Sequence, residues 1–143
     1  MKEKKYYYEV MEKLNFGMAL LEEKYESIAA AHNITYNRLM IIYILMEDEQ
    51  VTQMDICQAM HLPKSTVHSI VVSMQKDGLI VLQEGSNGKE KYVVTTERGR
   101  EQFQTIYDDV RGMEIELLDS IPEADLQHLL RIIDKIAALE SKQ

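Results

Sequence analysis

The feature that most constrains the fold is a change of hydrophobic period in the second half of the chain. Two short β-prone runs, residues 79–82 and 92–95, flank the polar, glycine-containing segment 84–90. On both sides of this region apolar residues instead recur every three or four positions, which is the spacing of amphipathic helices. Because the Asn-Gly pair at 87–88 suits a hairpin tip, the pattern predicts a mainly α chain interrupted by one antiparallel β-hairpin.

Four helices are expected before the hairpin. The first is long and amphipathic from residue 11 onward, with a seam of Met11, Leu14, Met18, Leu21, Tyr25 and Ile28. Thr35 is placed to cap a second helix, which should end in the acidic stretch 47–49. Thr52 and Asp55 have the spacing of a capping-box variant and predict the start of a short third helix.

The third and fourth helices should be joined by a tight turn. The third is expected to turn Ile56, Ala59 and Met60 inward. Pro63 suits the first turn of the fourth, which should end at Asp77-Gly78 and bury Val67, Ile70, Val71 and Met74. Two short helices in this order, followed by a hairpin, predict a winged helix-turn-helix.

Two amphipathic helices should follow the hairpin. The first has apolar positions at Phe103, Ile106, Tyr107, Val110, Met113 and Leu117, and the second at Leu126, Leu129, Leu130, Ile133 and Ile136. These helices and the first one carry more apolar surface than a small central module can cover. We therefore expect one α+β domain over residues 1–143, with about 35–98 as its DNA-binding part and about 6–32 and 99–140 as dimerisation helices.

Composition narrows the class of protein. The net charge is −8, but residues 52–98 contain as many basic as acidic side chains, so a surface for DNA can survive there. Cys57 is the only cysteine, which excludes an intrachain disulfide and agrees with a reducing compartment. The apolar runs are far shorter than the roughly 20 residues that cross a bilayer, and no export signal is evident. We therefore expect a cytoplasmic protein.

The central segment resembles the MarR (multiple antibiotic resistance regulator) family. The resemblance lies in residues 52–67 (TQMDICQAMHLPKSTV), 75–80 (QKDGLI) and 95–99 (TTERG), and it extends to the order of helices over nearly the whole chain. It implies an obligate homodimer that binds palindromic operators in double-stranded DNA. It also implies that a small ligand in the crevice between the dimerisation and DNA-binding parts often releases the DNA.

This chain departs from the family pattern at three places. His61 stands in the tight turn where the family usually has glycine, and Ser69 replaces a common arginine on the fourth helix. At the hairpin tip, Asn87-Gly88-Lys89 replaces an acidic residue followed by arginine. These differences leave Lys89 as the main basic residue at the tip.

Ten polar residues are the candidates for contact with DNA: Thr52, Gln53, Lys64, Ser65, Thr66, His68, Ser69, Asn87, Lys89 and Lys91. Those on the fourth helix lie opposite its apolar face, where hydroxyls and a lysine can reach base edges and phosphates. Lysines at the hairpin tip are placed for a neighbouring minor groove. The alternative is a solvated helix face, a capping role for Thr52 and a solvent-facing Lys91.

Other functions are weaker alternatives. Cys57 is expected to pack in or near the core rather than sense oxidants, and the four histidines have no metal-ligand spacing. Ser65 and His68 lack an orienting group for nucleophilic catalysis, so we expect no catalytic site, metal or cofactor. A set of tyrosines and methionines either lines a pocket for a small aromatic effector between the helices or, for most of them, forms dimer core: Tyr6, Tyr7, Tyr8, Tyr25, Tyr36, Tyr43, Met18, Met40 and Met46. A winged-helix module that binds proteins and has lost DNA binding is the rival function.

Overall fold

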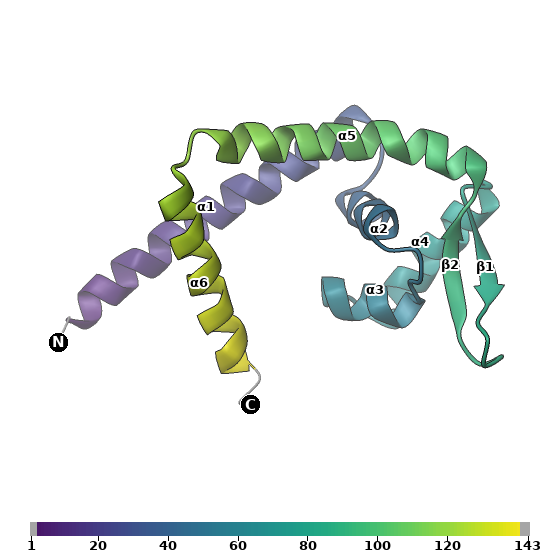
Figure 1. Ribbon diagram of the computed structural model, residues 1–143, viewed down its shortest axis with the longest axis horizontal. Coiled ribbons are helices and arrows are strands. Elements are labelled where there is room, and N and C mark those ends of the chain that lie inside the picture. The colour runs from purple at the N-terminus through teal and green to yellow at the C-terminus, as the bar shows by residue number, and fades with distance from the viewer. Residues whose placement is uncertain (1–2, 141–143) are drawn as a thin grey trace. The chain divides into compact units, whose positions relative to one another are not determined.

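The computed structural model describes residues 3–140. Figure 1 shows its helices and one hairpin: α1 Lys4–Ala31, α2 Tyr36–Glu47, α3 Gln53–Met60, α4 Lys64–Lys76, β1 Ile80–Glu84, β2 Lys91–Thr95, α5 Glu97–Asp119 and α6 Glu123–Glu140. This order confirms the α+β winged-helix fold class. The first helix begins at Lys4, several residues before the seam that predicted it.

The chain divides into two compact units within α5. The first unit ends at Val110 and the second begins at Arg111. The buried core lies in the first unit, where the largest fully buried side chains are Leu39, Ile41, Ile42, Ile56, Val67, Val71, Met74, Ile80, Val93, Phe103 and Val110. These residues come from α2 to α5, so one core fixes the helix-turn-helix, the hairpin and the start of α5 together. The single-domain organisation and the dimerisation segments stay predictions.

Side-chain caps begin two of the helices, as the sequence predicts. Thr35 Oγ1 accepts a hydrogen bond from Arg38 N at 3.2 Å at the start of α2. At the start of α3, Thr52 Oγ1 accepts from Asp55 N at 3.1 Å, while Asp55 Oδ2 accepts from Thr52 N at 2.9 Å. The two bonds form a reciprocal capping box, which satisfies backbone donors that the helix itself leaves free.

The turn between α3 and α4 is tight. His61 closes α3 in the left-handed region at φ 53°, and Leu62 N then donates to Cys57 O at 3.2 Å. Pro63 occupies the N-cap of α4, one residue before the first helical position. The inward face of α3 differs from the prediction, because Ile56 and Cys57 are buried whereas Ala59 is exposed. Eight residues make only about two turns, so the elements that pack against α3 decide which of its faces is buried.

The hairpin forms the wing, and an isolated β-bridge ties its second strand to the segment before α3. Ile80 pairs with Thr95 and Glu84 with Lys91, so the ends of both strands are in register. The bridge lies between residues 52 and 92, and beside it Val93 N donates to Val51 O at 2.7 Å. The wing is therefore tied directly to the start of the helix-turn-helix.

The return from the wing into α5 requires a close backbone approach. Thr96 N donates to Leu79 O at 3.0 Å, and Thr96 Oγ1 accepts from Gly99 N at 3.0 Å. A Cβ on Gly99 would stand 2.0 Å from Leu79 O. Only glycine fits there, which explains its place after Thr-Thr-Glu-Arg in the motif at 95–99.

Large apolar side chains remain exposed on both units. On α1 they include Tyr6, Tyr7, Tyr8, Met11, Leu14, Phe16 and Met18, and on α6 Leu129, Leu130, Ile132, Ile133, Ile136 and Leu139. Monomeric proteins rarely leave contiguous apolar patches of this kind uncovered. Within residues 3–140, no helix is both long and apolar enough to cross a membrane.

Candidate nucleic-acid interface

Helix α4 presents one buried and one open face. Val67, Val71 and Met74 are fully buried, which fixes how the helix is rotated about its axis. Lys64, Ser65, His68 and Ser69 are exposed on the other side, and Thr66 is half-buried at the edge between the two. The first turns of α4 therefore expose two hydroxyls, an ammonium group and an imidazole beside the positive end of the helix dipole.

Helices α3 and α4 are linked through two of the candidate residues. His68 Nδ1 lies 3.2 Å from Gln53 Oε1. Since an amide oxygen only accepts hydrogen bonds, this contact places the hydrogen on Nδ1 and leaves Nε2 for another partner. Thr52 instead caps α3, because its backbone N–H and its hydroxyl oxygen both form hydrogen bonds of the capping box. Its N–H is thus not free for a phosphate.

The wing tip, residues 85–90, is a turn built by Asn87. Its Oδ1 accepts from Lys89 N at 3.1 Å and from Glu90 N at 3.3 Å, and Gly88 adopts φ +70°. Asn87 therefore shapes the turn that presents Lys89, whose side chain is exposed. Lys91 is exposed in β2 and pairs in register with Glu84, which offsets its charge.

Arg38 positions the far end of α4, a role that the sequence did not reveal. Its Nη2 lies 3.0 Å from Asp77 Oδ2 and its Nη1 3.5 Å from Ser73 Oγ. In the part of the chain that the structure describes, Arg38 Nε is buried without a hydrogen-bond partner. A lone arginine in α2 carries no local signal for this contact, because its partners lie 35 and 39 residues further along.

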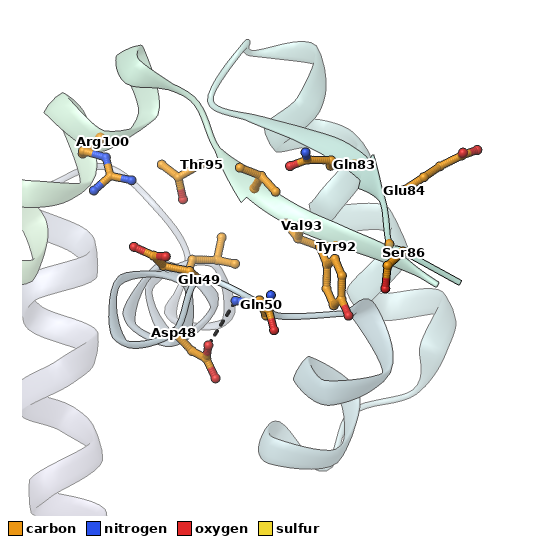
Figure 2. A pocket seen from close by; sticks show the side chains of 13 residues that line it. Asp48, Glu49, Gln50, Gln83, Glu84, Ser86, Tyr92, Val93, Thr95 and Arg100 are labelled. Atoms are coloured by element: carbon orange, nitrogen blue, oxygen red, sulfur yellow. Dashed lines mark hydrogen bonds between the residues drawn. The ribbon is translucent and has the colours of Figure 1, made fainter. Parts of the chain in front are cut away.

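A polar hollow of about 610 Å³ separates the wing from the end of α2. In Figure 2, Glu49 and Arg100 lie toward one end of it, and Ser86 and Tyr92 toward the other. Asp48 and Glu84 also line it, and Asp48 Oδ1 accepts from Gln50 N at 3.0 Å. Three carboxylates against one guanidinium make this side of the wing unfavourable for a phosphate backbone.

Cys57 lines a smaller hollow of about 320 Å³ between α3 and α4, together with Gln53, Met54, Lys64 and His68. The thiol residue is only 8% exposed, which agrees with the predicted packing near the core. No basic residue stands beside Cys57 in the sequence, but the fold brings Lys64 and His68 to the same hollow. Neighbours along the chain were a poor guide here because the turn folds α4 back over α3.

The residues predicted to line an aromatic pocket do not all lie together in the structure. Of the residues considered for it (Tyr6, Tyr7, Tyr8, Tyr25, Tyr36, Tyr43, Met18, Met40 and Met46), Met18, Tyr25 and Tyr36 line one hollow of about 480 Å³ between α1 and α2. Tyr43 instead packs against Tyr107 in a tilted arrangement, with ring centroids 5.8 Å apart. Burial raises the pKa of Tyr36 above its ordinary value of 10.0, and the charges of Glu22 and Glu26 raise it further.

In the described part of the chain, no group of three or more His, Cys, Asp or Glu side chains is placed to hold an ion. The closest pair of this type is His32 Nε2 and Asp109 Oδ2, at 2.6 Å. This contact joins the end of α1 to α5 within the first unit and is structural.

Comparisons with known proteins agree with this geometry. Residues 32–89 match the model of the MarR family. The fold is similar to Staphylococcus aureus MarR in complex with salicylate and kanamycin (TM-score 0.79, 17% identity, 98% of this chain and 95% of that one). A MarR family regulator from Neisseria meningitidis, NMB1585, gives a TM-score of 0.77 at 20% identity over 92% and 94%.

A third similar structure is CouR from Rhodococcus jostii RHA1 bound to p-coumaroyl-CoA, with a TM-score of 0.75 and 17% identity over 87% of this chain and 88% of that one. No curated protein matches the chain in sequence. The family match and the shared fold confirm the resemblance to MarR family regulators that residues 52–99 indicate.

Proposed function

We propose that this chain, which matches the MarR family over residues 32–89 and has the fold of MarR family regulators, is a transcription regulator that binds palindromic operators as a homodimer in the cytoplasm. The open face of α4 is the observation that supports this proposal most strongly. Its polar residues are held outward by the buried face of Val67, Val71 and Met74. A helix presented in this way fits the major groove.

The ten candidate residues fall into two groups in this proposal. Ser65, Thr66, His68 and Ser69 read base edges, because hydroxyl and imidazole groups both donate and accept hydrogen bonds. Lys64 and Lys89 contact phosphates or the minor groove, whereas Gln53 orients His68 and Asn87 orients Lys89. Thr52 acts through its capping box and Lys91 contributes little, since Glu84 lies beside it.

The homodimer supplies the spacing between the two copies of α4. Apolar side chains exposed on α1 and on α6 provide the surface that a second copy would cover. Two symmetry-related recognition helices must then lie about 34 Å apart to reach successive major grooves. A symmetric dimer of this kind reads a palindromic site, because each copy meets the same half-sequence.

Regulation by a small ligand follows from the same geometry. A ligand that binds one spacing of the two α4 helices better than another shifts the population toward that spacing. Salicylate is bound in the Staphylococcus aureus MarR structure and p-coumaroyl-CoA in that of CouR. We propose that the hollow between α1 and α2, which Tyr25 and Tyr36 line, receives the effector of this chain.

The proposal is tested by fluorescence anisotropy with DNA from upstream of the chain's own gene, over a series of salt concentrations. Replacing Lys89 by Ala should weaken binding to every sequence and reduce the slope of log K against log salt by about one, because one phosphate contact is lost. Lys24→Ala is the matched control, since Lys24 is an exposed lysine on α1. Its salt slope should equal that of the wild type.

Changes on α4 should act differently. Ser65→Ala or Ser69→Ala should change the preference among operator sequences and leave the salt slope unaltered, because a hydroxyl reads bases without neutralising a phosphate. Equal affinity of the wild type for all sequences, or no binding at low salt, would reject the proposal. The second result would favour the alternative in which the winged helix binds a protein.

A further inference from the structure

The hollow between α1 and α2 has a distinctive lining. Six of its residues come from one stretch of α1 (Asn15, Met18, Ala19, Leu21, Glu22 and Tyr25), and Tyr36 from the start of α2 completes it. Tyr25 and Tyr36 are half-buried, so each side chain packs partly against the protein and remains partly accessible to a ligand. A volume of about 480 Å³ is of the size that holds a drug-sized molecule.

The residues that line this hollow carry negative charge and no positive charge. Glu22 is its only ionisable carboxylate, and none of its seven residues is Lys, Arg or His. Glu26, one turn further along α1, adds to the negative field, because both glutamates raise the pKa of the Tyr36 hydroxyl. An organic anion placed here would meet this field without a compensating cation, whereas a cation would be attracted by it.

We propose that the hollow between α1 and α2 binds an organic cation with an aromatic or apolar body. The electron-rich faces of Tyr25 and Tyr36 and the carboxylate of Glu22 stabilise the positive centre. The Met18 thioether and the Leu21 side chain contact the apolar part, and Asn15 supplies a polar rim. This choice of ligand differs in charge from salicylate, one of the two ligands in the Staphylococcus aureus MarR structure.

The site is also placed to affect the dimer. Met18, Leu21 and Tyr25 belong to the apolar seam of α1, and Met18 and Leu21 are 58% and 37% exposed. A cation in the hollow therefore contacts residues that a second copy would also contact. The effect of the cation on DNA release rests on the proposed function, whereas its binding to the hollow does not.

Binding is tested first without DNA, by isothermal titration of the full chain. Tetraphenylphosphonium and tetraphenylborate are the probes, because they have the same shape and opposite charge. The phosphonium should bind more tightly than the borate. Glu22→Gln should lower the affinity for the phosphonium roughly five- to tenfold, which corresponds to the loss of one close charge contact at a partly exposed site.

Glu23→Gln is the matched control, since Glu23 is the exposed neighbour of Glu22 and does not line the hollow. It makes the same change in net charge and should leave the affinity unchanged. Tighter binding of the borate, or an equal effect of the two substitutions, would overturn the proposal. The second outcome would mean that only the overall acidic charge attracts the cation.

A separate titration adds the phosphonium to the preformed complex with operator DNA. Release of DNA by the wild type, with a shift to higher phosphonium concentration in Glu22→Gln, supports the cation as an effector. Binding without release would reject the effector role and leave the cation site intact. Absence of any DNA complex would reject the proposed function alone, because the first titration contains no DNA.

Discussion

Gly99 is the glycine at which the fold leaves least room for a side chain. Its Cβ would lie 2.0 Å from Leu79 O, and that oxygen cannot easily move because it also accepts from Thr96 N at 3.0 Å. Gly99→Ala should therefore destabilise the chain by about 2–3 kcal/mol, the upper part of the range for overpacking. Urea unfolding at a fixed protomer concentration measures this difference.

Gly112→Ala is the matched control for that prediction. Gly112 also lies within α5, but a Cβ there meets nothing within 4 Å. Alanine should stabilise the helix at this position by about 0.5–1 kcal/mol, because glycine loses more conformational freedom on folding. Equal effects of the two substitutions would show that Gly99 is not in close contact with the wing.

Tyr36 gives the chain a pH dependence at the alkaline end. Its pKa is raised in the folded chain above the ordinary value of 10.0, by burial and by Glu22 and Glu26. As the pH rises past 10, the unfolded chain releases this proton first, so the free energy of unfolding falls. This contribution is complete below pH 10 and is lost as the pH rises through the raised pKa of the folded chain.

Replacing Tyr36 by Phe removes the contribution of this hydroxyl to the pH dependence of stability. The free energy of unfolding of Tyr36→Phe, measured in urea at a series of values between pH 9 and pH 11, should decline less steeply than that of the wild type. Tyr8→Phe is the control, because it deletes the same hydroxyl from a side chain that is 62% exposed. A wild-type profile in Tyr36→Phe would show that burial, Glu22 and Glu26 do not raise the pKa of this hydroxyl in the folded chain.

Among the elements, α4 is fixed at its end by an ion pair with α2. Asp77 is the C-cap of α4, where the negative end of the helix dipole disfavours a carboxylate, and Arg38 offsets this charge. The pair is partly open to solvent, with side-chain exposures of 19% and 55%. Its coupling energy should therefore be small but measurable, about 0.2–1 kcal/mol.

A double-mutant cycle with Arg38→Met and Asp77→Asn measures this coupling. Methionine keeps much of the apolar stem and removes the buried Nε that lacks a partner within residues 3–140, so Arg38→Met alone should be only mildly destabilising. Arg38→Met should cost less stability in the Asp77→Asn background, where the carboxylate is already gone. Strictly additive effects would show that the ion pair does not link the two helices.

The elements were predictable from sequence where a local rule acts. Thr35 and the Thr52–Asp55 pair gave the starts of α2 and α3, and Asp77-Gly78 gave the end of α4. The prediction that Ala59 faces the core was wrong, because the rotation of a two-turn helix about its axis depends on the elements that pack against it. Within the candidate site, Arg38 and the Lys64 and His68 neighbours of Cys57 were missed, since tertiary contacts bring them together.

For the whole molecule, the distribution of charge agrees with its proposed assembly. The net charge is −8, yet residues 52–98 have equal numbers of acidic and basic side chains. The excess of acidic residues lies in the terminal segments, whose helices expose apolar seams. Repulsion between DNA and acidic segments favours an approach through residues 52–98, which include α4 and the wing tip.

The dimer is tested by placing charges in an exposed seam. Leu130 and Ile133 are 61% and 51% exposed on α6, so replacing both by Glu should leave the protomer folded and prevent association. Sedimentation equilibrium should then give a monomer, and its affinity for the palindrome should fall on the order of 100- to 1000-fold, because a monomer contacts one half-site. Lys135→Glu, an exposed change on the opposite face of α6, should remain dimeric with wild-type affinity. A dimeric double variant, or a monomer that binds the palindrome like the wild type, would mean that the two recognition helices are not spaced by this seam.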